Sequence, residues 1–263
     1  MKKNWNCYSY LYEKYKYYLQ GLPTYKEGRY RENIIWWCWL QWEKNAPKLN
    51  KTCLASIKKY VKGGKIIVID NDNLNTYVEF PKYIIEKHKK GIIPHAHFSD
   101  LIRLELLIKY GWTRIDSTVL FTWYEKVFFE SDFFVFQSSS NDDSEVASNW
   151  FITSNQDNPI LITTRNLLFK YWEDNDYLLN YFIFYMFFTM ATEKYHEIWD
   201  KMPKYSNIPP RTMQFELLWE YNKKRFEELE RISTIHKLNF KIDRWKLRKN
   251  SLFEYIENIY INS

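Results

Sequence analysis

Residues 97–122 of this 263-residue chain combine an apolar helix, a glycine turn and a strand that leads to a carboxylate. The helical part is apolar on nearly every turn, so we expect it to be buried on most sides. Ser99 or Asp100 is the expected N-cap, because a short side-chain oxygen can accept from the free amides of the first turn. Gly111 is expected to end the helix in a left-handed conformation. The segment therefore predicts a buried helix followed by a strand that delivers Asp116.

The polar side chains of this segment form two groups. Asp100 and Arg103 are neighbours on one helix face, and they fit either a site for sugar hydroxyls or a simple ion pair. Along the strand, alternation puts Arg114, Asp116 and Thr118 on one side. A carboxylate is a hard oxygen ligand that a neighbouring hydroxyl can assist, directly or through water. Asp116 could therefore serve as a ligand for a divalent cation.

The pattern of strands and helices indicates an α/β fold with a mixed, mainly parallel sheet flanked by helices. A strand at Ile34–Trp39, a helix at Pro47–Tyr60 and a strand at Ile66–Ile69 predict a parallel βαβ unit. In sheets of this kind, ligands bind beyond the carboxyl ends of the strands. Further expected elements are a helix at Pro81–Lys90, strand material at Val127–Phe136, helices at Asn166–Trp172 and Tyr177–Ala191, and additional C-terminal helices.

Composition limits the class of protein. The net charge of +6 and the aromatic fifth of the chain suit contact with anionic headgroups or phosphorylated ligands, although simple solubility also accounts for the charge. The tyrosine-rich residues 5–20 predict a helix that either covers the core or lies on a membrane. No pattern typical of nucleic-acid binding is present. Possible partners therefore include an anionic membrane but no nucleic acid.

Cysteine usage and hydropathy predict the compartment. Cys7, Cys38 and Cys53 form no Cys-x-x-Cys pair, which argues against a disulfide framework or a zinc site and for a reducing environment. The N-terminus lacks the apolar run of a signal peptide. The most apolar stretch, Tyr177–Ala191, is shorter than the ~20 residues that a membrane span needs. We expect a cytoplasmic protein that binds the inner face of the plasma membrane peripherally, if at all.

Several motifs, taken in order, resemble the capsular polysaccharide synthesis proteins, bacterial relatives of glycosyltransferase family 32. They are Ser-Asp-x-x-Arg, Lys-Tyr-Gly and Ile-Asp-x-Thr-Val within residues 97–122, and IIWWCWLQWEKNAP, ASNWF (147–151), YSNIPP (205–210) and STIHKL (233–238) elsewhere. The resemblance implies a Rossmann-type, GT-A-like fold over residues 1–263 as one glycosyltransferase domain. It implies a nucleotide-sugar-binding half at about 30–125 and an acceptor-side, C-terminal helical half at about 126–263.

The resemblance also implies roles for individual residues. The expected catalytic residues are Asp116 and Asp100; the expected donor-binding residues are Trp37, Asp100, Arg103, Arg114, Thr118, Asn149, Trp150 and Lys237; the expected metal ligands are Asp116 and His236. The implied metal is Mn²⁺, with Mg²⁺ as the alternative. Neutral imidazole suits Mn²⁺, and a lysine suits a diphosphate as a point charge.

Two features leave alternatives open. Gly111-Trp112-Thr113-Arg114 stands where the family usually has Gly-Gly-x-Trp, so a permissive backbone position beside the phosphates is lost. Arg114 then either contacts the diphosphate or pairs with Asp116 in the place of the metal. Residues 70–72 read Asp-Asn-Asp after a strand, which fits either a metal site or an ordinary turn.

These observations together predict a glycosyltransferase of the hexosyltransferase class. The resemblance implies transfer, with retention, from a nucleoside-diphosphate sugar, with UDP favoured, to a lipid-linked oligosaccharide of a capsular or cell-surface polysaccharide. The alternative is a GT-A-fold protein that binds a nucleotide sugar or glycan but is catalytically impaired.

Overall fold

A mixed five-stranded sheet with strand order β2-β1-β3-β6-β5 forms the centre of the protein. The computed structural model describes residues 2–19, 33–139 and 143–260. The strands of this sheet are β1 (Ile34–Cys38), β2 (Lys65–Ile69), β3 (Trp112–Ile115), β5 (Phe133–Gln137) and β6 (Ala147–Ser154). A second, two-stranded sheet pairs β4 (Val119–Phe121) with β7 (Ile235–Lys237).

The direction of the strands confirms the predicted α/β class and the predicted βαβ unit. β1 pairs in parallel with both β2 and β3, and α2 (Lys48–Tyr60) is the crossover between β1 and β2. β6 runs antiparallel to β3 and to β5, so two of the four pairings are parallel. The sheet is therefore partly rather than mainly parallel in its pairings.

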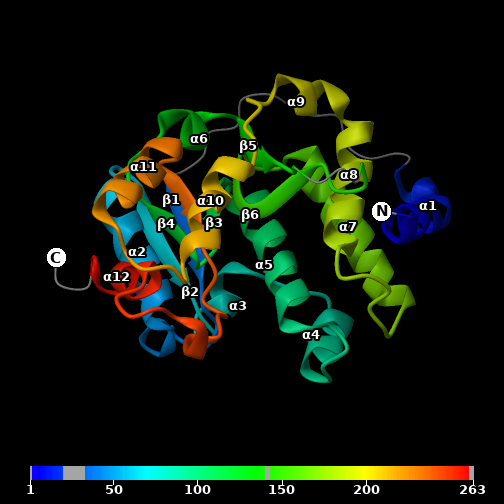
Figure 1. The fold of residues 1–263 in the computed structure, drawn as a ribbon. Helices are drawn as coiled ribbons and strands as arrows, with labels where there is room; N and C mark the ends of the chain where they lie inside the picture. The colour runs from blue at the N-terminus through cyan, green and yellow to red at the C-terminus, as the bar shows by residue number, and fades with distance from the viewer. Residues whose placement is uncertain (1, 20–32, 140–142, 261–263) are drawn as a thin grey trace.

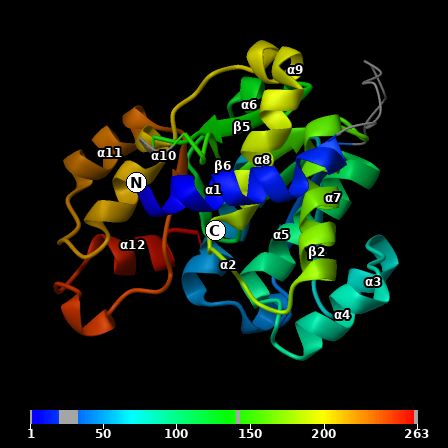
Figure 2. The ribbon, with the colours of Figure 1, turned by 90° about the vertical axis from the view of Figure 1, so that its right-hand side faces the viewer.

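Three apolar helices cover one face of the sheet, as Figure 1 shows: α5 (His95–Tyr110), α7 (Pro159–Asp174) and α8 (Ile183–Lys194). α1 (Lys2–Tyr15) lies across α7 and α8 (Figure 2). Its inward stripe is Tyr8, Leu11 and Tyr15, and the Tyr15 ring meets the Phe187 ring edge-on at 5.5 Å. The tyrosine-rich start of the chain thus covers the core, and its remaining aromatic side chains face outward.

A second core lies on the opposite face of the sheet, under α2 and α6 (Lys126–Glu130). A third joins α2 and the β4–β7 sheet to α10 (Ile208–Glu216), α11 (Lys223–Ile232) and α12 (Leu252–Asn258). The shorter helical segments are η1 (Lys16–Leu19), η2 (Glu43–Asn45), α3 (Leu74–Tyr77), α4 (Lys82–Lys89), α9 (His196–Lys201) and η3 (Arg244–Lys246). Within the described ranges, no helix is both long and apolar enough to cross a membrane.

The prediction of Ser99 or Asp100 as a helix N-cap is wrong. α5 begins at His95 after Pro94, whose backbone is extended, so Asp100 lies inside the helix. Proline is favoured at helix starts because its missing N–H is one of the donors that a helix leaves unpaired there. Asp100 therefore does not cap a helix end and instead projects from within a buried element.

Three other predicted boundaries also differ. Val127–Phe136 splits into α6 and β5, and α7 begins at Pro159, where the Asn158 side chain accepts from the Ile160 N–H. α8 begins at Ile183, six residues later than expected. The start of α7 thus has a local signal, an Asn cap followed by a proline in the first turn, which the sequence analysis overlooked.

Candidate functional site

The carboxyl ends of β1 and β3 meet at one edge of the sheet, because the two strands are parallel neighbours. A cavity of about 500 Å³ opens at this edge. The residues that line it are Cys38, Trp39, Leu40, Gln41, His95, Ala96, Ser99, Arg114, Asp116, Ser117, Thr118, Tyr181, Lys237, Leu238, Asn239, Phe240 and Lys241. Segments from both halves of the chain thus enclose the position where the sequence analysis expected the site.

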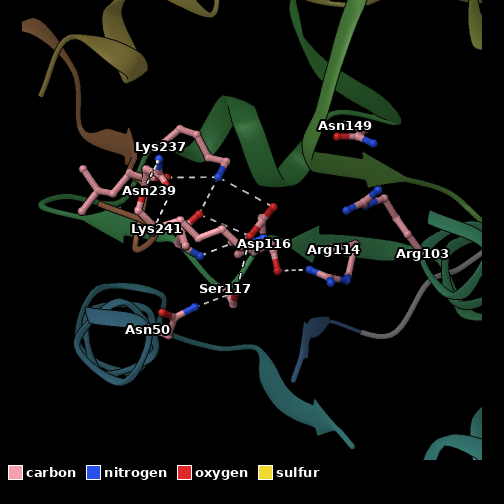
Figure 3. A network of polar contacts seen from close by, with 12 residues as sticks. Asn50, Arg103, Arg114, Asp116, Ser117, Asn149, Lys237, Asn239 and Lys241 are labelled. Carbon is pink, nitrogen blue, oxygen red and sulfur yellow. Dashed lines mark hydrogen bonds and ion pairs between the residues drawn. The ribbon is translucent and has the colours of Figure 1, made fainter. Parts of the chain in front are cut away.

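Asp116 is the central carboxylate of this cavity (Figure 3). It follows β3 directly, and its backbone N–H donates to the Trp150 carbonyl at 2.8 Å. Its Oδ1 accepts from the Thr118 N–H at 3.2 Å and from the Thr118 hydroxyl at 3.3 Å. With Oδ1 engaged and the side chain 31% exposed, the other oxygen, Oδ2, faces the cavity and Lys237.

Positive groups stabilise the ionised form of Asp116. Burial alone would raise the pKa of this carboxyl, but Lys237, Arg114, Arg103 and the Thr118 N–H outweigh burial and lower the pKa to about 2. The Lys237 ammonium lies 3.8 Å from Asp116 Oδ2 and also donates to the Thr118 hydroxyl. Asp116 is therefore a carboxylate across the physiological pH range.

The second sheet brings Lys237 to the cavity. Val119 on β4 pairs with Lys237 on β7, so a lysine late in the chain lies beside the turn that holds Asp116. On the opposite side, Asn50 of α2 donates to the Ser117 hydroxyl at 2.9 Å. The turn between β3 and β4 is thus held by contacts from α2 and β7, which limits the positions open to Asp116.

Two buried arginines extend the positive charge behind Asp116. Arg114 is 2% exposed, donates to the Ile115 carbonyl and lines the cavity, and Arg103 is 4% exposed. Burial lowers the pKa of Arg114, and the nearby Arg103 lowers it further. The Nε atoms of both arginines lack a hydrogen-bond partner among the described residues. Two guanidinium groups buried this close together repel each other, and an anionic ligand in the cavity that Arg114 lines would offset part of that cost.

Asp100 lies in a polar network beside the cavity. It forms an ion pair with Arg103 on the next turn of α5, and its side chain is 15% exposed. The Asn149 Nδ2 on β6 donates to Asp100 Oδ1 at 2.9 Å. Burial raises the pKa of Asp100, and the Arg103 and His97 charges oppose that rise. The structure therefore brings Asp100, Arg103 and Asn149 together, next to Ser99 in the cavity wall.

Six of the ten predicted residues do not line this cavity. Asp100, Arg103 and Asn149 lie in the polar network beside it, whereas the side chains of Trp37, Trp150 and His236 lie elsewhere. Trp37 is fully buried with Ile115 in the core under α2, and the Trp150 ring stacks on Phe136 at 4.6 Å. Only the backbone carbonyl of Trp150 reaches Asp116. His236 points away from the cavity, because adjacent residues on β7 face opposite sides and Lys237 faces Asp116. We therefore correct the sequence-based placement of these three side chains at the donor or metal.

Aromatic residues that sequence reasoning did not select line the cavity instead. Trp39 meets Phe240 edge-on at 5.7 Å, and Tyr181, which is 62% exposed, stands at the rim. The position of Trp39 just past the carboxyl end of β1 could have pointed to it, because ligands bind beyond the carboxyl ends of parallel strands. Nothing local marks Phe240 or Tyr181, whose placement depends on the packing of distant segments.

The Asp-Asn-Asp sequence after β2 forms a turn. Asp70 Oδ1 accepts from the backbone N–H groups of Asp72 and Asn73 at 3.0 and 3.2 Å. Asp72 Oδ2 accepts from the Trp42 indole at 2.6 Å. The bonds are those of an Asx-turn, and neither carboxylate lines the cavity, which favours the turn interpretation.

A larger cavity lies elsewhere and contains none of the predicted residues. It measures about 830 Å³ and lies between the start of β5 and the end of α8, with Asp132, Lys194 and Tyr195 in its wall. β5 begins opposite the Trp112 end of β3, so this cavity opens at the other edge of the sheet from Asp116. Size alone therefore does not identify the candidate site.

The family resemblance implies a divalent metal ion, and the cleft offers few ligands for one. Among the described residues no group of three or more His, Cys, Asp or Glu side chains could hold one. The cleft supplies one carboxylate, that of Asp116, and the hydroxyls of Ser117 and Thr118 lie beside it. Mg²⁺-type ions are commonly held by one or two carboxylates together with substrate phosphates. The residues fit a metal that arrives with a diphosphate.

The fold and the site define an α/β protein with an electropositive cleft and one central carboxylate at the carboxyl edge of its sheet. The sequence profile of the family described as capsular polysaccharide synthesis protein matches residues 1–256, so the chain belongs to that family. No curated protein has a matching sequence. The solved structure of the PaToxG glycosyltransferase is similar with a TM-score of 0.45 and 12% identity, over 95% of this chain and 93% of that one. The assignment rests on the family match.

Proposed function

We propose that this protein is a glycosyltransferase that uses a nucleoside-diphosphate sugar, with UDP favoured, to extend a lipid-linked oligosaccharide of a capsular or cell-surface polysaccharide. Membership of the capsular polysaccharide synthesis family supports this role. The observation that carries the proposal is the position of Asp116 in the cleft, 3.8 Å from Lys237 and beside Arg114. Hexosyl specificity and retention of configuration belong to the same proposal.

The residues of the cleft suit a leaving diphosphate. Lys237 and Arg114 supply positive charge where negative charge grows on the leaving group, and such preorganised charge stabilises a transition state. Asp116, with the Ser117 and Thr118 hydroxyls, would hold Mn²⁺ or Mg²⁺, which when bound supplies further neutralising charge. Asp100 offers its carboxylate to sugar hydroxyls, a contact that orients the sugar toward the acceptor. Trp39 and Phe240 offer ring faces to the nucleoside.

Replacement of Asp116 tests the proposal. We expect Asp116→Asn to lower the rate of donor hydrolysis or transfer, measured with Mn²⁺ and a UDP-sugar, by about 100-fold or more. Chelation of the metal should lower the wild-type rate similarly. Asp72→Asn is the matched control, because it removes the same charge from the turn after β2 and should change the rate by less than about twofold. Wild-type turnover in Asp116→Asn would refute the assigned role.

The contact between Lys237 and Asp116 also favours a second candidate, a protein that binds nucleotide sugars without turnover. An ammonium 3.8 Å from Asp116 Oδ2 competes with a metal for the same oxygen. Calorimetric titration with nucleotide sugars separates the candidates. Binding with no hydrolysis or transfer for any donor and acceptor tried would favour the second candidate, whereas turnover would exclude it.

A further inference from the structure

Tyr185 of α8 is linked to Asp100 through a single side chain. The Tyr185 hydroxyl donates to Asn149 Oδ1 at 2.8 Å, and Asn149 Nδ2 donates to Asp100 Oδ1 at 2.9 Å. The three residues come from α8, β6 and α5, so the link joins two helices on one face of the sheet through a strand of the sheet. Sequence reasoning did not select Tyr185, which carries no motif of its own.

The hydrogen bonds fix which way the Asn149 amide points. An ionised carboxylate only accepts, so the NH₂ group must face Asp100 and the carbonyl must face Tyr185. Tyr185 can satisfy that carbonyl because its hydroxyl keeps its proton: burial raises the pKa of Tyr185, and the Asp100 charge raises it further. The orientation of Asn149 is thus set from both ends.

This arrangement leaves one oxygen of Asp100 for a ligand. Both Arg103 and Asn149 donate to Oδ1. Oδ2 accepts no hydrogen bond from any described residue. It is not fully buried either, so a ligand can reach it. Ser99, the preceding residue, lines the cavity beside Asp116. Oδ2 is therefore the acceptor that Asp100 can present.

We propose that Tyr185 is a positioning residue, whose hydroxyl holds the Asn149 amide so that Asp100 stays ionised and presents Oδ2 to a hydroxyl of the donor sugar. The inference rests on the proposed function, because it assumes a sugar at Asp100. Without the Tyr185 hydroxyl, only Asp100 would orient the Asn149 amide, and the carbonyl would lose its donor. The hydrogen bond from Asn149 Nδ2 to Asp100 would then be held less firmly and would stabilise the ionised carboxylate less.

Other charged and titratable groups also face Asp100. Arg103 and His97 lie on α5, Arg114 lies on β3, and Asp116 follows β3. Arg211 on α10 and Tyr181 before α8 face Tyr185. Replacing the Tyr185 hydroxyl by hydrogen leaves all of these groups in place. A change in the titration of Asp100 after that replacement therefore reports the hydroxyl itself.

Tyr185→Phe tests the proposal in the full-length protein. We expect the pKa of the Asp100 carboxyl to rise by about one unit, because a hydrogen bond to the charged form is weakened. The acidic limb of the pH profile of kcat/KM for the donor should move to higher pH by the same amount. At neutral pH the donor KM should rise about three- to tenfold, with a smaller change in kcat. Tyr83→Phe, which removes a tyrosine hydrogen bond to the Phe169 carbonyl, should change none of these values.

Carbon-13 NMR of labelled aspartate, assigned with Asp100→Asn, measures the Asp100 titration without any substrate. An unchanged Asp100 titration in Tyr185→Phe would overturn the proposal even if the activity fell. If Tyr185→Phe does not fold, Asn149→Leu removes the same link and should raise the pKa of Asp100; an unchanged pKa there also overturns it. Failure of the wild type to bind any nucleotide sugar would instead refute the proposed function, and the NMR comparison would still decide whether Tyr185 controls Asp100.

Discussion

Trp112 occupies a backbone conformation that normally favours glycine. Its φ is +67°, directly after Gly111 at +73°. A left-handed conformation costs a residue with a Cβ about 1–2 kcal/mol. The Trp112 side chain is 6% exposed in the core under α2 and α6, and burial of a large apolar group offsets such a cost. The turn before Asp116 thus keeps a glycine-like backbone although the second glycine is replaced.

His236 is a residue-scale source of pH dependence in stability. Burial lowers its pKa to about 3, its Nε2 lies 3.4 Å from the Thr122 hydroxyl, and the side chain is 1% exposed. The unfolded chain binds a proton near pH 6.5, whereas the folded protein does so only near pH 3. Stability contributed by neutral His236 is therefore present above pH 6.5 and is lost as the pH falls through this window.

We expect the free energy of unfolding to fall by about 1.4 kcal/mol per pH unit below pH 6.5 on account of His236. Urea denaturation between pH 7 and pH 5 measures this slope. In His236→Leu the slope should be shallower by that amount, whatever the stability at pH 7. His196→Leu, which replaces an imidazole that is 68% exposed, is the control. An equal slope in His236→Leu and wild type would contradict the assignment.

At the scale of elements, α5 connects the core to the site. Leu101, Leu104 and Leu107 are fully buried against α7 and the sheet, while Asp100 and Arg103 on the same helix reach the polar network. Apolar packing on several sides holds the helix in one position. The carboxylate of Asp100 is therefore placed by side chains that make no polar contact.

Leu104→Ala tests the contribution of α5 to stability. Removing three carbons from a fully buried position should lower the free energy of unfolding by about 2–5 kcal/mol, because the transferred surface is lost and a cavity remains. Urea or thermal denaturation measures the change. Lys82→Ala on α4, whose side chain is 90% exposed, should change stability by less than about 0.5 kcal/mol. If the free energy of unfolding fell by less than about 1 kcal/mol in Leu104→Ala, elements other than α5 would fix the position of the site.

At the scale of the whole molecule, α1 has two chemically different sides. Tyr8, Leu11 and Tyr15 pack inward, whereas Trp5 and Tyr12, seven residues apart on one helix face, are 49% and 37% exposed. Tryptophan and tyrosine favour membrane interfaces, and a net charge of +6 attracts anionic lipid. We propose that this outer side of α1 contacts an anionic membrane.

Vesicle co-sedimentation tests this proposal. We expect the protein to bind phosphatidylserine-containing vesicles, to bind neutral phosphatidylcholine vesicles weakly, and to be released by high salt, because salt screens the attraction. The double variant Trp5→Ala, Tyr12→Ala should weaken binding by about tenfold. Trp245→Ala removes another exposed tryptophan, in the basic segment after β7, and should have a smaller effect. Equal binding of both vesicle types would refute an electrostatic contact.

The sequence by itself determined the local parts of this protein. A glycine after an apolar helix, and the strand–helix–strand pattern from β1 to β2, predicted that Asp116 lies at the carboxyl end of a strand. The family followed from several motifs that occur in order. These are short-range signals, because turn conformation and periodicity depend on neighbours along the chain. The functional roles assigned to Asp116 and Asp100 stay predictions.

Only the tertiary structure decided which side chains meet at the site. Lys237 donates to Thr118 across 119 positions of the chain, Tyr185 reaches Asn149 across 36, and Asn149 reaches Asp100 across 49. The tryptophans around β1 look alike in sequence, yet Trp37 lies in the core and Trp39 in the cleft. The physical reason is that burial and long-range pairing are set by how sheet faces and helices pack, which no local pattern encodes.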